Sequence, residues 1–192
     1  MTRTATRTAS RAAIVLTLVL PLLAPDAGAA AYPALTFEER LELAEDIFVG
    51  RVTALDAEVR DGDPWTLVTL QVETWLLHEG TPTDVGPFEV TLAFLGGQAP
   101  GVPPRLVAGF PTFELGERVL VASYGALARA ASPLVGVTQG LWREEADVWR
   151  DSAGEALALD AALRPQLAPD GDPESIWLPA LAAHLSELRG EP

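Results

Sequence analysis

The clearest hydrophobic pattern in the chain is an alternation within Trp65–Leu77. Val68, Leu70, Val72 and Leu76 share one parity, and the polar residues Thr69, Gln71 and Glu73 share the other. A two-residue period is typical of an antiparallel strand with one face in the core. We therefore expect Leu70 to be buried and Gln71 to be exposed.

Shorter apolar runs between turn signals predict the other strands. Asp61–Pro64 has turn composition, and Gly96–Pro111, rich in glycine and proline, predicts an irregular loop. The expected strands are Ile47–Val59 with a bulge at Gly50, a segment around Phe88–Phe94, Arg118–Tyr124, Leu134–Arg143, and a hairpin over Val148–Asp160.

Two helices are expected, one near each end of this β-rich region. Thr36 and Glu39 have the spacing of a capping box, which predicts a short helix from Thr36 to about Asp46. A polar link over Arg164–Glu174 leads to a second helix over Pro179–Arg189, with Gly190 as its C-cap. Strands without long helices between them indicate a mainly β fold, a small antiparallel barrel or sandwich, rather than a parallel doubly wound sheet.

The first residues have the order of an export signal. Arg3, Arg7 and Arg11 form a basic start, Ala12–Leu23 is apolar, and small residues follow at Ala27–Ala31. This order is typical of a cleaved signal peptide, and the apolar run is too short to span a bilayer. We expect a signal peptide over residues 1–31, a β-barrel domain over 32–160, and a linker with a C-terminal helix over 161–192. The mature protein is then periplasmic or secreted, with no stable membrane anchor.

Composition narrows the classes of partner and chemistry. The 192-residue chain has a formal net charge of −14 and no cysteine. A negative field repels phosphate backbones, so nucleic-acid binding is not expected. The lack of cysteine excludes disulfides, thiolate zinc sites and a cysteine nucleophile.

Three segments carry a resemblance to a known family. They are Asp46–Val52 (D-I-F-V-G-R-V), Phe113–Val121 (F-E-L-G-E-R-V-L-V) and Gly136–Arg143 (G-V-T-Q-G-L-W-R). In order and spacing they resemble uncharacterised exported bacterial proteins whose barrel is similar to the OB-fold domain of tissue inhibitors of metalloproteinases. The resemblance implies an OB-like antiparallel barrel over about residues 37–150. Those inhibitors chelate zinc through an amino-terminal cysteine, which this chain lacks, so it does not imply their mechanism.

The residues that carry catalytic or metal chemistry are few. His78 and His184 are the only histidines, which is short of the three or four ligands of a zinc site. No serine lies in a nucleophile motif, although a triad assembled in space stays open. Asp170–Glu174 has alternating oxygen ligands but not the frame of a calcium loop, and Glu144–Asp147 is a second acidic group. We expect no catalytic residue, metal ligand or cofactor.

The tryptophans form the candidate binding surface. Trp65 and Trp75 share the parity of Gln71, which predicts that they face outward, and Trp142 lies on a later strand. Outward tryptophans are common interface anchors, but the terminal helices are also able to cover them. The leading hypothesis is a non-catalytic exported barrel that binds a protein partner or an envelope component through these residues. The alternatives are a regulator or inhibitor of a secreted protease, and a carboxylate-dependent hydrolase.

Overall fold

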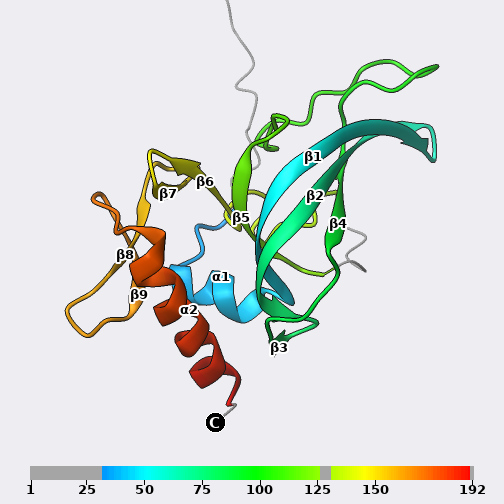
Figure 1. The fold of residues 1–192 in the computed structure, drawn as a ribbon. Helices are drawn as coiled ribbons and strands as arrows, with labels where there is room; N and C mark the ends of the chain where they lie inside the picture. The colour runs from blue at the N-terminus through cyan, green and yellow to red at the C-terminus, as the bar shows by residue number, and fades with distance from the viewer. Residues whose placement is uncertain (1–31, 126–130, 191–192) are drawn as a thin grey trace, which may run out of the picture. The chain divides into compact units, whose positions relative to one another are not determined.

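The structure is a computed structural model that describes residues 32–125 and 131–190. The expected signal peptide over residues 1–31 lies outside the described residues. The described chain forms one antiparallel sheet with two helices (Figure 1). In chain order its elements are α1 (Phe37–Leu43), β1 (Asp46–Arg60), β2 (Asp63–His78), β3 (Thr81–Pro82), β4 (Glu89–Leu95), β5 (Arg118–Ser123), β6 (Leu141–Glu145), β7 (Val148–Asp151), β8 (Ala156–Leu159), β9 (Pro165–Ala168) and α2 (Glu174–Arg189).

The two longest strands, β1 and β2, form a hairpin that arches away from both helices (Figure 1). The predicted register of β2 is confirmed, because Leu70 is fully buried and Gln71 is exposed. The register between the two strands shifts at three places, between Ile47 and Phe48, between Val49 and Gly50, and between Val52 and Ala54. At each shift one strand has an extra, unpaired residue. Side chains beyond the shift therefore lie on the face opposite to the one that simple alternation predicts.

The pairing path runs β3-β2-β1-β5-β6-β7-β8-β9, and β4 pairs with β2 off this path. The mainly β, antiparallel class with a helix near each end is confirmed. Among the described residues no pairing joins β4 to β6 or to the far end of the path, so the sheet is open rather than closed into a barrel.

The sheet is buried on both faces where β1 and β5 meet. Side chains of one parity, such as Ile47 and Leu120, join a cluster that includes α1 and α2. Those of the other parity, such as Phe48 and Val121, join a second cluster inside the curve of β1, β2 and β4. Burial on both faces explains why Ile47–Val52 reads as a nearly continuous apolar run.

Three predicted boundaries were wrong. The strand expected over Leu134–Arg143 begins only at Leu141, because residues 135–140 form turns held by backbone bonds. The polar link expected over Arg164–Glu174 contains β9. The last helix begins at Glu174, so Pro179 lies inside it. The buried side chains of Trp177, Leu181 and Leu185 form one helical face, and their packing outweighs the helix-breaking tendency of proline.

The predicted helix caps are confirmed, but α1 ends at Leu43 rather than near Asp46. Thr36 and Glu39 form the capping box at the start of α1, and Gly190 caps α2 in the left-handed conformation. No helix in residues 32–125 and 131–190 has the length and apolar character needed to cross a bilayer.

Candidate functional site

The prediction that Trp75 faces outward was wrong. Trp75 is 6% exposed, and its ring packs against Phe48 and His78 at centroid distances of 4.9 and 4.6 Å. Its indole Nε1 donates a hydrogen bond to the carbonyl oxygen of Pro87 at 3.0 Å. Gly86 lies so close to the ring that any side chain there would collide with it. The segment before β4 therefore covers Trp75, and the terminal helices do not.

A β-bulge in β2 explains this error. Gly50 of β1 pairs with Val72, but its neighbour Val49 pairs with Thr74, so Glu73 is an extra residue. An extra residue reverses the parity of those that follow it. Trp75 consequently lies on the same buried face as Val72.

The other two tryptophans of the expected binding surface are also engaged within the molecule. Trp142 is 1% exposed and packs edge-on against Phe37 at 6.0 Å, with the Arg40 guanidinium 5.8 Å from its ring. Trp65 is half-buried, and the Arg60 guanidinium lies 5.2 Å from its ring. These three residues do not form one open surface.

The structure has instead an apolar groove, here called the distal groove, at the outer half of the β1–β2 hairpin. It is a cavity of about 450 Å³ between the hairpin, the end of β4 and the loop over residues 96–113. Its lining includes Leu55, Phe94, Leu106, Val107, Phe110 and Phe113. In Figure 1 the loop that follows β4 projects beside the tip of the hairpin. This is the size range of pockets that bind small molecules or side chains of a partner.

The groove follows from the third register shift in the hairpin. Val52 of β1 is buried opposite Leu70, and the extra residue Thr53 then separates it from Leu55 opposite Val68. Leu55 consequently continues the core-facing side of the hairpin beyond the edge of the core. It is 39% exposed, although Val68 beside it is fully buried. The core-facing side of the hairpin therefore extends beyond the side chains that cover it at Val68, and Leu55 is left partly exposed.

The loop wall of the groove is fixed by backbone hydrogen bonds. Gly96 N–H donates to the carbonyl of Pro64 at 2.8 Å, and the Thr66 hydroxyl donates to the carbonyl of Gly96 at 3.0 Å. Gly97 and Arg105 exchange two bonds of 2.8 and 3.0 Å. A side chain at Gly97 would collide with the Thr66 hydroxyl, and its φ of +99° also requires glycine. The groove is therefore formed before any partner binds.

Leu106 is the most exposed large apolar side chain of the described chain, at 97%. It directly follows Arg105, whose backbone is held by the Gly97 bridge, so its exposure is imposed by an ordered loop. Sequence reasoning missed it because the loop was expected to be irregular. The signal was present in Leu106 and Val107, two apolar residues within a glycine- and proline-rich segment.

A second cavity of about 370 Å³ lies near the start of the described chain. Tyr32, Leu43 and Tyr124 line it, together with Phe110, which also lines the distal groove. Gln139 fixes the segment beside it, because its side chain accepts from Leu35 N–H at 2.7 Å and donates to the carbonyl of Pro33 at 2.9 Å. Apolar surface thus continues from one cavity to the other through Phe110.

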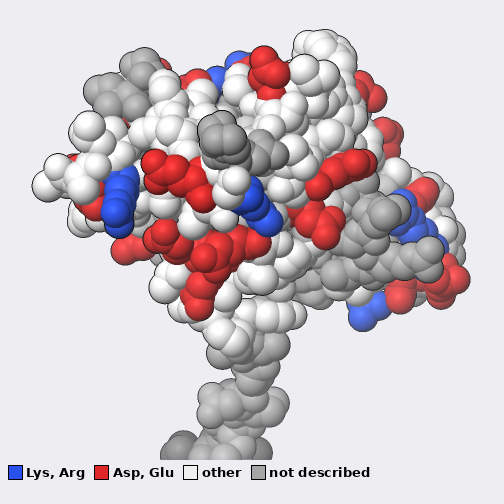
Figure 2. Space-filling model, turned by 90° about the horizontal axis from the view of Figure 1, so that it is seen from below, with Lys and Arg blue, Asp and Glu red and all other residues white. Residues whose placement is uncertain are grey.

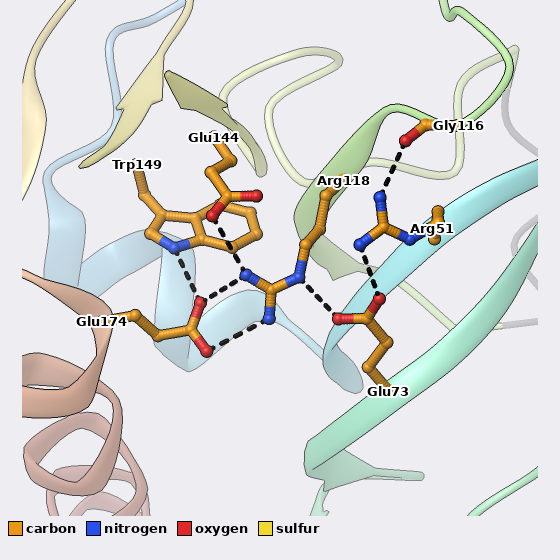
Figure 3. Close-up of polar contacts among 7 residues, drawn as sticks. All are labelled: Arg51, Glu73, Gly116, Arg118, Glu144, Trp149 and Glu174. Atoms are coloured by element: carbon orange, nitrogen blue, oxygen red, sulfur yellow. Dashed lines mark hydrogen bonds and ion pairs between the residues drawn. The ribbon is translucent and has the colours of Figure 1, made fainter. Parts of the chain in front are cut away.

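A polar cluster around Arg118 of β5 joins this strand to α2, β2, β6 and β7 (Figure 3). Its guanidinium donates to Glu174 of α2 at 2.8 and 3.1 Å, to Glu73 of β2 at 2.5 Å and to Glu144 of β6 at 3.3 Å. It also lies 5.1 Å from the Trp149 ring, whose Nε1 donates to Glu174 at 3.0 Å. This cluster attaches the start of α2 to the sheet.

The charge balance of this cluster keeps Arg118 protonated. Partial burial lowers the pKa of Arg118, but hydrogen bonds to Glu174 and Glu73 outweigh burial and raise it above its ordinary value. All three carboxylates bind the same cation. Glu144 and Glu174 therefore have a structural role here.

The two histidines lie against separate carboxylates. Nδ1 of His78 lies 2.9 Å from Asp46, which also accepts from the backbone N–H of Glu79 at 3.0 Å. Nε2 of His184 lies 3.2 Å from Glu38 and joins α2 to α1. The described residues contain no group of three or more histidine or carboxylate side chains arranged to hold a metal ion.

The acidic segment that was compared with a calcium loop is used in packing. Asp172 accepts from the backbone N–H of Leu159 at 2.8 Å, and Glu174 binds Arg118. The carboxylates with shifted pKa values are Glu39 and Asp160, and backbone hydrogen bonds lower both pKa values.

Carboxylates dominate the molecular face shown in Figure 2, where basic side chains are fewer. Exposed acids on and next to α1 and in the β2–β3 turn include Glu38, Glu42, Glu45 and Glu79. The excess of acids matches the net charge of −14.

Comparison with known proteins finds no matching family model, no matching curated protein and no matching solved structure.

Proposed function

We propose that this protein is an exported, non-catalytic binding domain that holds a protein partner or an envelope component in the distal groove. Export is supported by the basic and then apolar order of residues 3–31. The observation that carries the binding function is the groove itself. It is apolar, formed in advance, and bordered by the almost fully exposed side chain of Leu106.

An apolar side chain held in water on an ordered loop has no role in the stability of the fold. Exposed apolar surface around a cavity is typical of interaction sites. The expected tryptophan surface offers no such site, because Trp75 and Trp142 are buried. We therefore move the proposed contact from the tryptophans to Leu55, Leu106 and Phe110.

The other two hypotheses receive less support. Regulation of a secreted protease is a special case of partner binding, and nothing in the groove is specific to a protease. A carboxylate-dependent hydrolase needs two facing acids around a substrate. The carboxylates that converge most closely, Glu144 and Glu174, bind Arg118 between them.

We also propose that the sheet is a partly open, OB-like barrel. Pairing in the order β4-β2-β1-β5-β6 supports this, because it places β4 and β6 as the two strands that would have to meet. A 2.8 Å hydrogen bond from Leu95 N–H to the carbonyl of Ala131 brings the segment before β6 to the end of β4.

The binding function is tested by removing the apolar groups of the groove. In the Leu55→Ser/Leu106→Ser variant, two exposed or half-exposed side chains change without a change in charge. The native protein and the variant are incubated with the envelope fraction of the source cells, cross-linked and recovered, and the bound components are identified by mass spectrometry. Loss of two apolar anchors should weaken binding by about tenfold or more.

Val85→Ser is the matched control, because Val85 is 74% exposed and does not line the groove. It should retain the partner, and both variants should melt within a few degrees of the native protein. Equal recovery of the same partner by the native protein and the groove variant would refute binding through the groove.

A further inference from the structure

We infer that the distal groove binds a segment of another protein in which apolar side chains are flanked by lysine or arginine. This inference rests on the proposed binding function and specifies the chemistry of the partner. It follows from the shape of the groove and from the charges around it.

The exposure of the groove favours a macromolecule over a free small ligand. Sites for small molecules enclose most of the ligand surface with buried lining residues. Here Leu106 is 97% exposed and Leu55 is 39% exposed, so a ligand inside the cavity would leave much of this apolar border in water. A protein segment that inserts one side chain and lies across the border would cover both leucines. This arrangement of a central anchor and a covered rim is typical of protein interfaces.

The charges beside the groove favour a cationic partner. The hairpin tip carries four carboxylates, Asp56, Glu58, Asp61 and Asp63. Arg105 lines the groove, but its charge is paired with Asp63 at 2.6 Å, and Arg60 at the tip is paired with Glu58. Asp56 and Asp61 make no ion pair with the described residues, and both are exposed.

The net charge of the whole chain also favours a cationic partner. A net charge of −14 attracts cationic segments and repels anionic membranes. Apolar contacts in the groove would supply affinity, and the acids at the tip would select and orient the partner. A membrane with anionic lipids is the less favoured occupant, and it enters the test as a competing outcome.

The probe is an array of short peptides. Each peptide has a central triplet of leucine, valine or phenylalanine in all combinations, flanked on both sides by lysine, serine or glutamate. We expect binding in the order lysine, serine, glutamate, and a steep loss of binding to the lysine series as salt increases. Leu55→Ser/Leu106→Ser should abolish binding to all three series, and Val85→Ser should not.

The source of the charge preference is tested by two neutralised variants. Asp56→Asn/Asp61→Asn removes two exposed charges from the outer part of the hairpin, and Glu187→Gln/Asp147→Asn removes two exposed charges from α2 and from the β6–β7 turn. The first variant should bind the lysine series about three- to tenfold more weakly, and the second should differ little from the native protein. Both variants have the same net charge. A difference in their affinity for the lysine series therefore shows that the charge preference comes from the acids of the hairpin.

Three results would overturn the inference. They are no binding by any peptide, equal binding of the lysine and glutamate series, and stronger binding to vesicles of anionic lipid than to the lysine peptides. In each case the envelope recovery experiment still decides separately whether the groove binds a partner. Failure of the charge preference is therefore distinguishable from failure of the proposed function.

Discussion

Replacing Arg118 with methionine should strongly destabilise the fold without touching the groove. The side chain of Arg118 is 18% exposed, and those of Glu73, Glu144 and Glu174 are 26–30% exposed. Methionine retains much of the packing on Trp149 but leaves Glu144 and Glu174 without a cation and Glu73 with Arg51 alone. Breaking a fully buried ion pair from one side costs about 3–5 kcal/mol. Partial exposure reduces this, so we expect a loss of about 2–4 kcal/mol.

The measurement is urea unfolding of Arg118→Met and of the native protein, followed by circular dichroism. In a domain of this length each kcal/mol corresponds to roughly 2–4 °C in Tm, so the variant should melt about 4–16 °C lower. Arg51→Met is the matched control from the same cluster. The side chain of Arg51 is 47% exposed and lies 3.2 Å from Glu73, so it should cost less than about 1 kcal/mol.

The salt dependence decides whether the loss is electrostatic. Salt screens the attraction of the glutamates to Arg118 in the native protein and their mutual repulsion in Arg118→Met. The difference in unfolding free energy between the two proteins should therefore be largest at low ionic strength and should shrink as salt increases. A difference that is the same at low and high salt, or a loss no larger than that of Arg51→Met, would refute the assignment of Arg118 as the ionic attachment of α2.

Two further predictions test the core. Leu70→Asp places a carboxylate at a fully buried position and should prevent folding, whereas Gln71→Asp on the opposite face should stay within about 0.5 kcal/mol of the native protein in urea unfolding. Trp75→Ala should cost about 3–5 kcal/mol because the ring is 6% exposed, and Trp65→Ala should cost clearly less. Equal losses within either pair would contradict the faces that the structure assigns to β2.

Periodicity predicted the parts of the fold where packing is local and regular. The middle of β2 alternates without interruption, and Leu70 and Gln71 lie on the faces that the alternation indicates. The capping box at Thr36 and the glycine cap at Gly190 also depend on a few neighbouring residues. These features need no information from distant parts of the chain.

The candidate site could not be predicted in the same way, because bulges decide it. Parity places Trp75 outside, and only the extra residue Glu73 returns it to the core. Simple alternation also places Leu55 and Val52 on opposite faces of the strand. They lie on the same face because Thr53 is an extra residue between them. A bulge is defined by the partner strand, so the sequence of one strand does not reveal it.

The distribution of arginines links the fold to the proposed partner. In the described part of the chain seven arginines form ion pairs with carboxylates, and another, Arg189, donates to backbone carbonyls of Leu41, Glu42 and Ala44. The positive charges thus stabilise the fold itself, as at Arg118. The chain has 27 acidic residues and 13 arginines, so many carboxylates remain for the surface. A partner in the proposed distal groove would therefore meet a predominantly negative molecule with apolar contacts in the groove. Such a surface would discriminate between partners by charge before contact and by apolar fit afterwards.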